Sequence, residues 1–301
     1  MKKSQMFILI ALLLTGCAGL TQMQDTIAKF DQGAHSVSAA QMNFFHQVQT
    51  AQCNRDFYTA AFDYSAHSRV KEVPKLVAPC DPTELTNDQL KIRQNLMDAI
   101  TLYADAIQTL ANGSDNKNLS DNSKDLAGNI KTLASQQKFA SITPGETAAL
   151  NAALVTITNM VLDHTKYKHI RDAASQIQPQ LAIVVAELKS ENLFDAQALK
   201  SKANLLDNQF GTALAAARDN AAAVSPDKTG VASFLDLVQA HLTYQSIVIT
   251  PPDVTKMNDA LDALVAANQA VARTTNGGAI PEISDLISRA QQAAALYKSE
   301  K

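Results

Sequence analysis

Apolar residues recur at steps of three and four along almost the whole chain, and this spacing limits the fold more than any other feature. A step of three or four residues places side chains on one face of an α-helix, whereas a half-buried strand alternates apolar and polar residues. The first long segment has such a row, formed by Met23, Ile27, Phe30, Ala34, Val37, Phe44, Val48 and Ala51. The pattern predicts an all-α protein.

Composition supports the same fold class. The 301 residues include 49 alanines but only 10 glycines and 9 prolines, and aromatic residues make up 5%. A β-sandwich needs more β-branched, aromatic and turn residues, and a doubly wound α/β enzyme needs glycine-rich loops. Because 46% of the residues are hydrophobic and only 18% charged, the chain can bury a core and is not expected to be disordered.

Clusters of proline and glycine divide the chain into helical segments. No proline or glycine separates segments 170–188 and 196–217, so two helices and one long helix both remain open. Pro179 is predicted to kink the first of these segments. The predicted helices cover residues 20–66, 86–112, 126–133, 143–161, 170–188, 196–217, 231–242, 254–271 and 283–297.

The repeated 3,4 pattern is typical of helices that pack at shallow angles. It predicts an elongated antiparallel bundle of about 7–9 helices with coiled-coil-like heptad packing. Gln41 and Asn268 interrupt otherwise apolar rows, and such a polar residue often fixes the register between helices. The proline-rich residues 67–83 are predicted to be a loop or linker within one cooperative domain.

The first residues predict export. Met1, Lys2 and Lys3 precede an apolar run from Met6 to Leu14, as in a secretory signal peptide. This run is too short to span a membrane, which takes about 20 residues. It ends in Leu14-Thr15-Gly16-Cys17, which resembles the lipobox of bacterial lipoproteins.

This resemblance implies processing and a location. Residues 1–16 would be the signal peptide, and residues 17–301 would form the mature domain. Cys17 would carry a diacylglyceryl group and a further acyl chain such as palmitate. In such lipoproteins an aspartate after the cysteine usually retains the protein at the inner membrane. Ala18 at this position therefore favours the outer membrane, with the protein facing the periplasm and anchored in membrane lipid.

Charge excludes one class of partner. Loss of residues 1–16 removes Lys2 and Lys3 and no acidic residue, so the formal charge changes from −3 to −5. A mildly acidic chain without a basic patch is not expected to bind nucleic acid.

Two cysteines remain once Cys17 is assigned to lipid. Cys53 and Cys80 would lie in an oxidising compartment, which favours a disulfide that joins the first helix to the proline-rich loop. Such a bond would stabilise the fold by about 3–4 kcal/mol. Two free thiols, and a metal or redox role, are the alternatives.

The sequence contains no recognisable catalytic motif. Metalloprotease, nucleophile-elbow and phosphate-loop patterns are missing, so we expect neither an enzyme nor a cofactor or metal. The densest polar stretch, residues 163–172, is predicted to be a solvated helix junction. A less favoured interpretation makes it a partner-binding patch formed by His164, Lys166, Lys168, His169 and Arg171. His164 and His169 would lie about 140° apart on a helix and could not share a metal.

Two functional hypotheses follow. The first is a non-catalytic envelope lipoprotein, a helical-bundle interaction or scaffold module tethered through Cys17 that binds an envelope protein. The alternative is a periplasmic helical bundle that binds a small ligand, a metal or haem between its helices.

Overall fold

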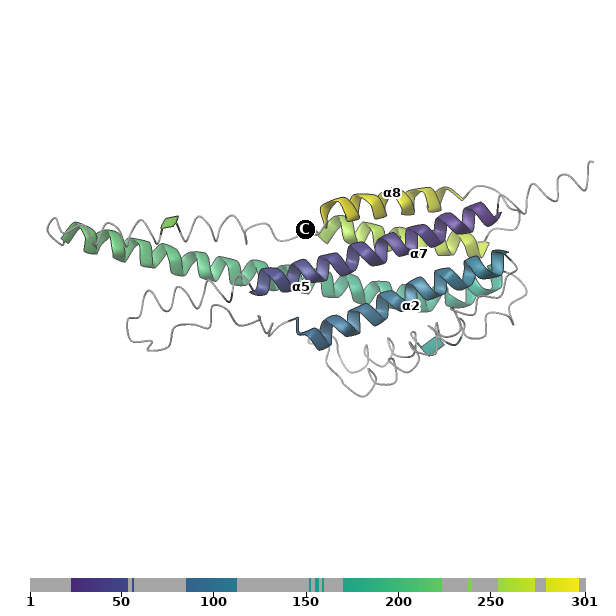
Figure 1. The fold of residues 1–301 in the computed structure, drawn as a ribbon, viewed down its shortest axis with the longest axis horizontal. Coiled ribbons are helices and arrows are strands. Elements are labelled where there is room, and N and C mark those ends of the chain that lie inside the picture. Colours follow the sequence, from purple (N-terminus) through teal and green to yellow (C-terminus); the bar gives the residue numbers. More distant parts are fainter. Residues whose placement is uncertain are drawn as a thin grey trace, which may run out of the picture. The chain divides into compact units, whose positions relative to one another are not determined.

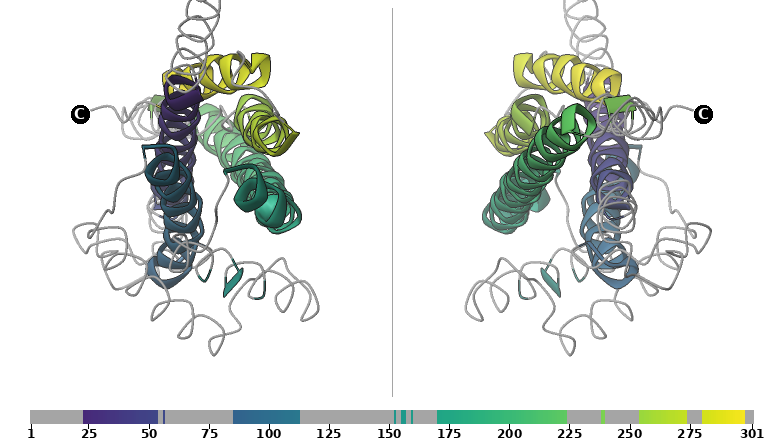
Figure 2. Two further views of the ribbon diagram at one scale, coloured as in Figure 1. Left: turned by 90° about the vertical axis from the view of Figure 1, so that its right-hand side faces the viewer. Right: turned by 90° about the vertical axis from the view of Figure 1, so that its left-hand side faces the viewer.

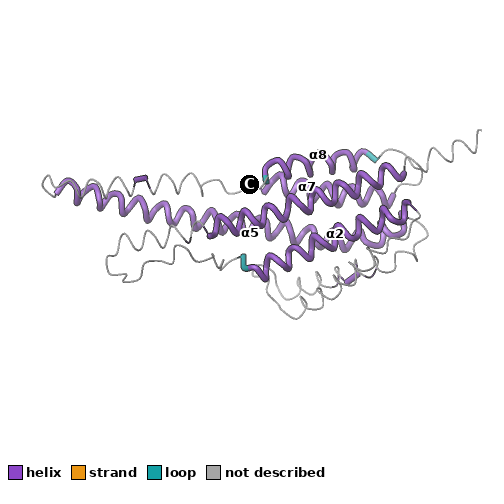
Figure 3. Tube along the Cα trace, in the orientation of Figure 1, coloured by secondary structure: helices purple, strands orange, loops and turns teal. Residues whose placement is uncertain are grey.

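The structure is a computed structural model of the whole chain. It describes residues 23–53, 56, 85–112, 152, 155–156, 159, 170–223, 238–239, 254–273 and 280–297. Across these residues the chain is helical except beside a few helix ends, and none of them forms a strand (Figure 1, Figure 3). The all-α prediction is therefore confirmed. The predicted helices at 126–133, 143–161 and 231–242 fall wholly or mostly outside the described residues, as does the linker at 67–83.

The long helices occupy the predicted segments, although the predicted end of the first of them, residue 66, lies outside the described residues. They are an N-terminal helix (residues 23–53), α2 (Asn87–Asn112), α5 (Ile170–Ala223), α7 (Val254–Arg273) and α8 (Pro281–Leu296). α2 starts one residue after Thr86, and α8 has Pro281 in its first turn, where a missing N–H leaves no hydrogen bond unmade. None of the described helices is both long and apolar enough to cross a membrane.

Helix α5 settles the alternative left open by the sequence. Its 54 residues form one continuous helix of about 80 Å, with Pro179 inside it. A proline in a helix leaves the carbonyl four residues earlier without its N–H donor. Here that carbonyl belongs to Ser175, and both Ser175 and Pro179 are exposed, so water can reach the unpaired group.

The chain divides into two compact units. The first comprises Met1–Asn43, Asp88–Glu191 and Val254–Lys301, and the second comprises Phe44–Asn87 and Asn192–Asp253. The core of the first unit consists of residues from the predicted 3,4 rows. Those at most 2% exposed include Ile27, Phe30, Ala34, Val37, Leu96, Ile100, Ile107, Ile177, Leu181, Met257, Leu261, Leu264, Ile283 and Leu286.

Two close helix contacts lie in the first unit. Helices α7 and α8 lie side by side (Figure 2). The N-terminal helix approaches α8 closely at Gly33, where an added Cβ would lie 2.7 Å from side-chain carbons of Leu286. Glycine is therefore required here for the two helices to come so near.

In the second unit, the end of the N-terminal helix is bound to the start of α2. The side chain of Gln52 is buried and accepts a hydrogen bond from the Leu85 N–H at 3.1 Å. Gln49 Nε2 donates to the Leu85 carbonyl at 3.2 Å and to Asn87 Oδ1 at 3.0 Å. Cys53 is in a disulfide. Its pairing with Cys80 remains a prediction, because Cys80 lies outside the described residues.

Candidate functional site

Most of the sequence-predicted site residues lie outside the described part of the chain. These are Cys17, Cys80, His164, Lys166, Lys168 and His169. Arg171 is described and lies exposed in the first turn of α5, with its Nε 3.9 Å from Asp172 Oδ1. The partner-binding patch therefore remains a prediction.

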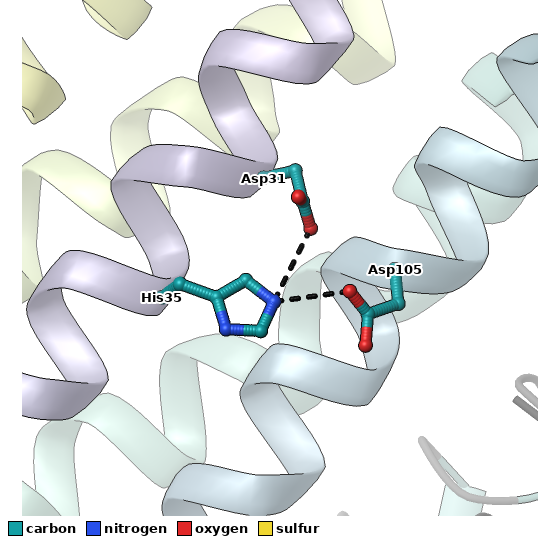
Figure 4. Close-up of side chains that lie close together, drawn as sticks. All are labelled: Asp31, His35 and Asp105. Carbon is teal, nitrogen blue, oxygen red and sulfur yellow. Dashed lines mark hydrogen bonds and ion pairs between the residues drawn. The ribbon is translucent and has the colours of Figure 1, made fainter. Parts of the chain in front are cut away.

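The structure brings together a cluster that the sequence analysis did not select. Asp31 and His35 lie four residues apart on the N-terminal helix and so share a face, and Asp105 faces them from α2 (Figure 4). His35 Nε2 is 3.0 Å from Asp105 Oδ1 and 3.6 Å from Asp31 Oδ1. One possible ligand atom from each residue lies within 4.8 Å of the other two.

Contacts made by α2 residues on either side of Asp105 pair these two helices. The rings of Phe30 and Tyr103 meet edge to face, with centroids 6.2 Å apart and an interplanar angle of 81°. Gln24 Nε2 donates to the carbonyl of Ala111 at 3.1 Å. Residue numbers rise along one helix as they fall along the other, so the two helices are antiparallel. In this register Asp105 lies level with the helical turn that carries Asp31, one turn before His35.

The three groups of the cluster are unequally buried, and their charges interact. The exposed fraction is 15% for the Asp31 side chain, 32% for Asp105 and 50% for His35. Burial and the negative charge of Asp105 raise the pKa of Asp31 to about 6, although His35 opposes the shift. The hydrogen bond to Asp105 raises the pKa of His35. Two carboxylates held this close favour a proton or a cation between them.

A second polar group is centred on Asn268, whose side chain is completely buried. Asn268 Oδ1 accepts a hydrogen bond from the Tyr103 hydroxyl, and its Nδ2 donates to the Ala174 carbonyl at 3.2 Å and to Gln178 Oε1 at 2.6 Å. These bonds join α2, α5 and α7. Burial also raises the pKa of the Tyr103 hydroxyl, which therefore stays neutral. Both Asn268 amide protons are used, so this group serves packing and offers no donor to a ligand.

A buried ion pair links α2 and α5. Arg93 and Glu191 are 5% and 2% exposed, and Arg93 Nη2 donates to Glu191 Oε2. Arg93 Nη1 also donates to the Gln89 carbonyl at 3.4 Å. Burial raises the pKa of Glu191, and the charge of Arg93 partly offsets this shift. The pair is enclosed, so it is structural and not accessible to a ligand.

The cluster could have been detected only in part from the sequence. The i, i+4 spacing of Asp31 and His35 is visible, but Asp105 follows 70 residues later and is brought in by helix pairing. The sequence search favoured residues 163–172 because it detects only groups that are close along the chain. Comparisons with protein families, with curated proteins and with solved structures gave no match to this chain.

Proposed function

We propose that this chain is a non-catalytic envelope lipoprotein that acts as a protein-interaction or scaffold module. The observation that carries this proposal is Leu14-Thr15-Gly16-Cys17, placed directly after a short apolar run. In the proposed mature protein, residues 1–16 are removed and acyl chains on Cys17 hold the protein at the outer membrane, facing the periplasm. Two or three acyl chains are enough for stable anchoring.

We further propose that residues 17–301 form an elongated antiparallel bundle of about 7–9 helices with heptad packing. The buried 3,4 rows of the described helices support this arrangement, as does the antiparallel pairing of the N-terminal helix with α2.

The exposed apolar residues of α5 support an interaction role. Leu193, Phe194 and Leu205 are 46%, 47% and 60% exposed. Phe194 and Leu205 are eleven residues apart, which places them within about 20° of one another around the helix. Exposed apolar side chains that share a face are typical of protein-binding surfaces. The proposed partner is an envelope protein with a complementary apolar surface.

The anchor is tested by labelling cells with a fatty acid analogue and separating their membranes. The unchanged protein should carry the label and fractionate with the outer membrane. Cys17→Ser should lose both, and Ala18→Asp should keep the label but move to the inner membrane. A Cys17→Ser protein that remains labelled and membrane-bound would refute the proposed anchor.

The interaction surface is tested with a photocrosslinking amino acid at one position at a time in cells. Positions 194 and 205 should give an adduct with the same envelope protein. Position 200 is the matched control, because Lys200 is also exposed on α5 but lies about 120° away from Phe194. Equal adducts at all three positions, or none at 194 and 205, would argue against this surface.

A further inference from the structure

We propose that Asp31, His35 and Asp105 form a binding site for a divalent first-row transition-metal ion, with Zn²⁺ as the reference ion. The site supplies one imidazole nitrogen and two carboxylate groups from two paired helices (Figure 4). It goes beyond the proposed scaffold role, because nothing in that role requires a metal.

The spacing of the donor atoms fits such an ion. Zn²⁺ binds nitrogen and oxygen at about 2.0–2.2 Å, so two ligands in a tetrahedral site lie about 3.3 Å apart. His35 Nε2 lies 3.0 Å from Asp105 Oδ1 and 3.6 Å from Asp31 Oδ1, on either side of this value. All three donor atoms lie within 4.8 Å of one another, so movement of the side chains alone would bring them to ligand distances.

The charge of the cluster favours a cation. Asp31 and Asp105 carry like charges at close range, and burial makes the charge on Asp31 costly in free energy. Asp31 Oδ1 is buried and has no hydrogen-bond donor among the described residues. A divalent ion would bind this oxygen directly and cancel the repulsion between the carboxylates.

The donor types indicate which metals can bind. Imidazole suits zinc, copper, iron and nickel, whereas magnesium and calcium prefer sites made of oxygen alone. His35 is half exposed, so three protein ligands would leave coordination positions open to water. The proposed site therefore prefers Zn²⁺ over Mg²⁺ and Ca²⁺.

The test is calorimetric titration of the acylated full-length mature protein in detergent with Zn²⁺. The unchanged protein should bind one Zn²⁺ at this site, and His35→Gln and Asp105→Asn should each weaken binding by at least about tenfold. Matched controls are His46→Gln and Asp25→Asn, since His46 and Asp25 are exposed on the same helix. Both controls should change the affinity by less than about twofold.

A second readout separates ligation from loss of structure. Co²⁺ bound through nitrogen and oxygen gives visible absorption bands, which should appear with the unchanged protein and both controls but not with either ligand variant. Circular dichroism in the absence of metal identifies any variant that fails to fold, and the other ligand variant then decides. The proposal is overturned if folded His35→Gln or Asp105→Asn binds Zn²⁺ as tightly as the unchanged protein, or if excess Mg²⁺ displaces Zn²⁺.

Discussion

Gly33 and Gly211 both lie inside helices, yet alanine at the two positions should change stability in opposite directions. At Gly33, an added Cβ would lie 2.7 Å from Cγ and Cδ2 of Leu286, a distance that real Cβ contacts essentially never show. At Gly211, the added Cβ would meet nothing within 4 Å. Alanine would therefore increase the helix propensity at both positions, but only Gly211 has space for the added Cβ.

The expected magnitudes follow from these two effects. Replacing glycine by alanine inside a helix stabilises it by about 1 kcal/mol, so Gly211→Ala should raise the free energy of unfolding by about 0.5–1 kcal/mol. Leu286 is completely buried and cannot turn away into solvent. Overpacking of this kind costs about 1–3 kcal/mol, so Gly33→Ala should lower the free energy of unfolding by about 1 kcal/mol.

The assay is urea denaturation followed by circular dichroism, with Leu286→Ala as a second background. Leu286→Ala alone should cost about 2–5 kcal/mol, because it leaves a cavity. It also removes the atoms that the added Cβ would strike, so Gly33→Ala should become stabilising in that background. The reasoning is refuted if Gly33→Ala stabilises the unchanged protein as much as Gly211→Ala does.

Three further predictions use the same denaturation assay. Asn268→Leu should lower the free energy of unfolding by about 2–4 kcal/mol, because it leaves the Tyr103 hydroxyl and a backbone carbonyl of α5 without their partner. A double-mutant cycle with Tyr103→Phe should show coupling of about 1 kcal/mol. Arg93→Met should lower the free energy of unfolding by about 3–5 kcal/mol at neutral pH, because it leaves the Glu191 carboxylate buried without its cation. The loss should be smaller in acid, because burial raises the pKa of Glu191 and a protonated Glu191 needs no cation. The pKa of Asp31 is about 6 in the folded protein and about 3.9 when unfolded, so the folded state holds more protons between these values. With metal removed by chelation, titration of Asp31 should therefore lower the free energy of unfolding by about 2 kcal/mol as the pH rises from 4 to 6, and Asp31→Asn should remove this part of the slope. The first prediction is contradicted if Asn268→Leu and Tyr103→Phe show no coupling. The second is contradicted if the stability lost in Arg93→Met does not depend on pH. The third is contradicted if the pH dependence of stability is the same in Asp31→Asn as in the unchanged protein.

The sequence could predict those features that depend on local spacing. The rows through Ile27 and Leu261 were identifiable because a helix repeats every 3.6 residues, and both side chains are buried as expected. Asn268 was recognisable as a polar interruption of such a row, and its burial is confirmed. Helix α5 could be predicted only as two alternatives, because no proline or glycine lies between residues 188 and 196 to mark a boundary there.

Features that depend on contacts between distant segments could not be predicted. Arg93 and Glu191 are charged and would ordinarily be solvated, but their enclosure depends on how α2 and α5 pack. Nothing in the sequence around Gly33 indicates that Leu286 packs against it. The cluster of Asp31, His35 and Asp105 likewise depends on how the N-terminal helix and α2 are aligned. Side-chain periodicity alone does not determine this alignment.

The start of the N-terminal helix limits the reach of the proposed lipoprotein. Only five residues separate Cys17 from Met23, where the described helix begins. Even when fully extended, this connection spans at most about 20 Å, less than the length of the 31-residue helix that follows. So short a connection would hold one end of the proposed bundle against the membrane, and the rest of the protein could extend from it only by its own length.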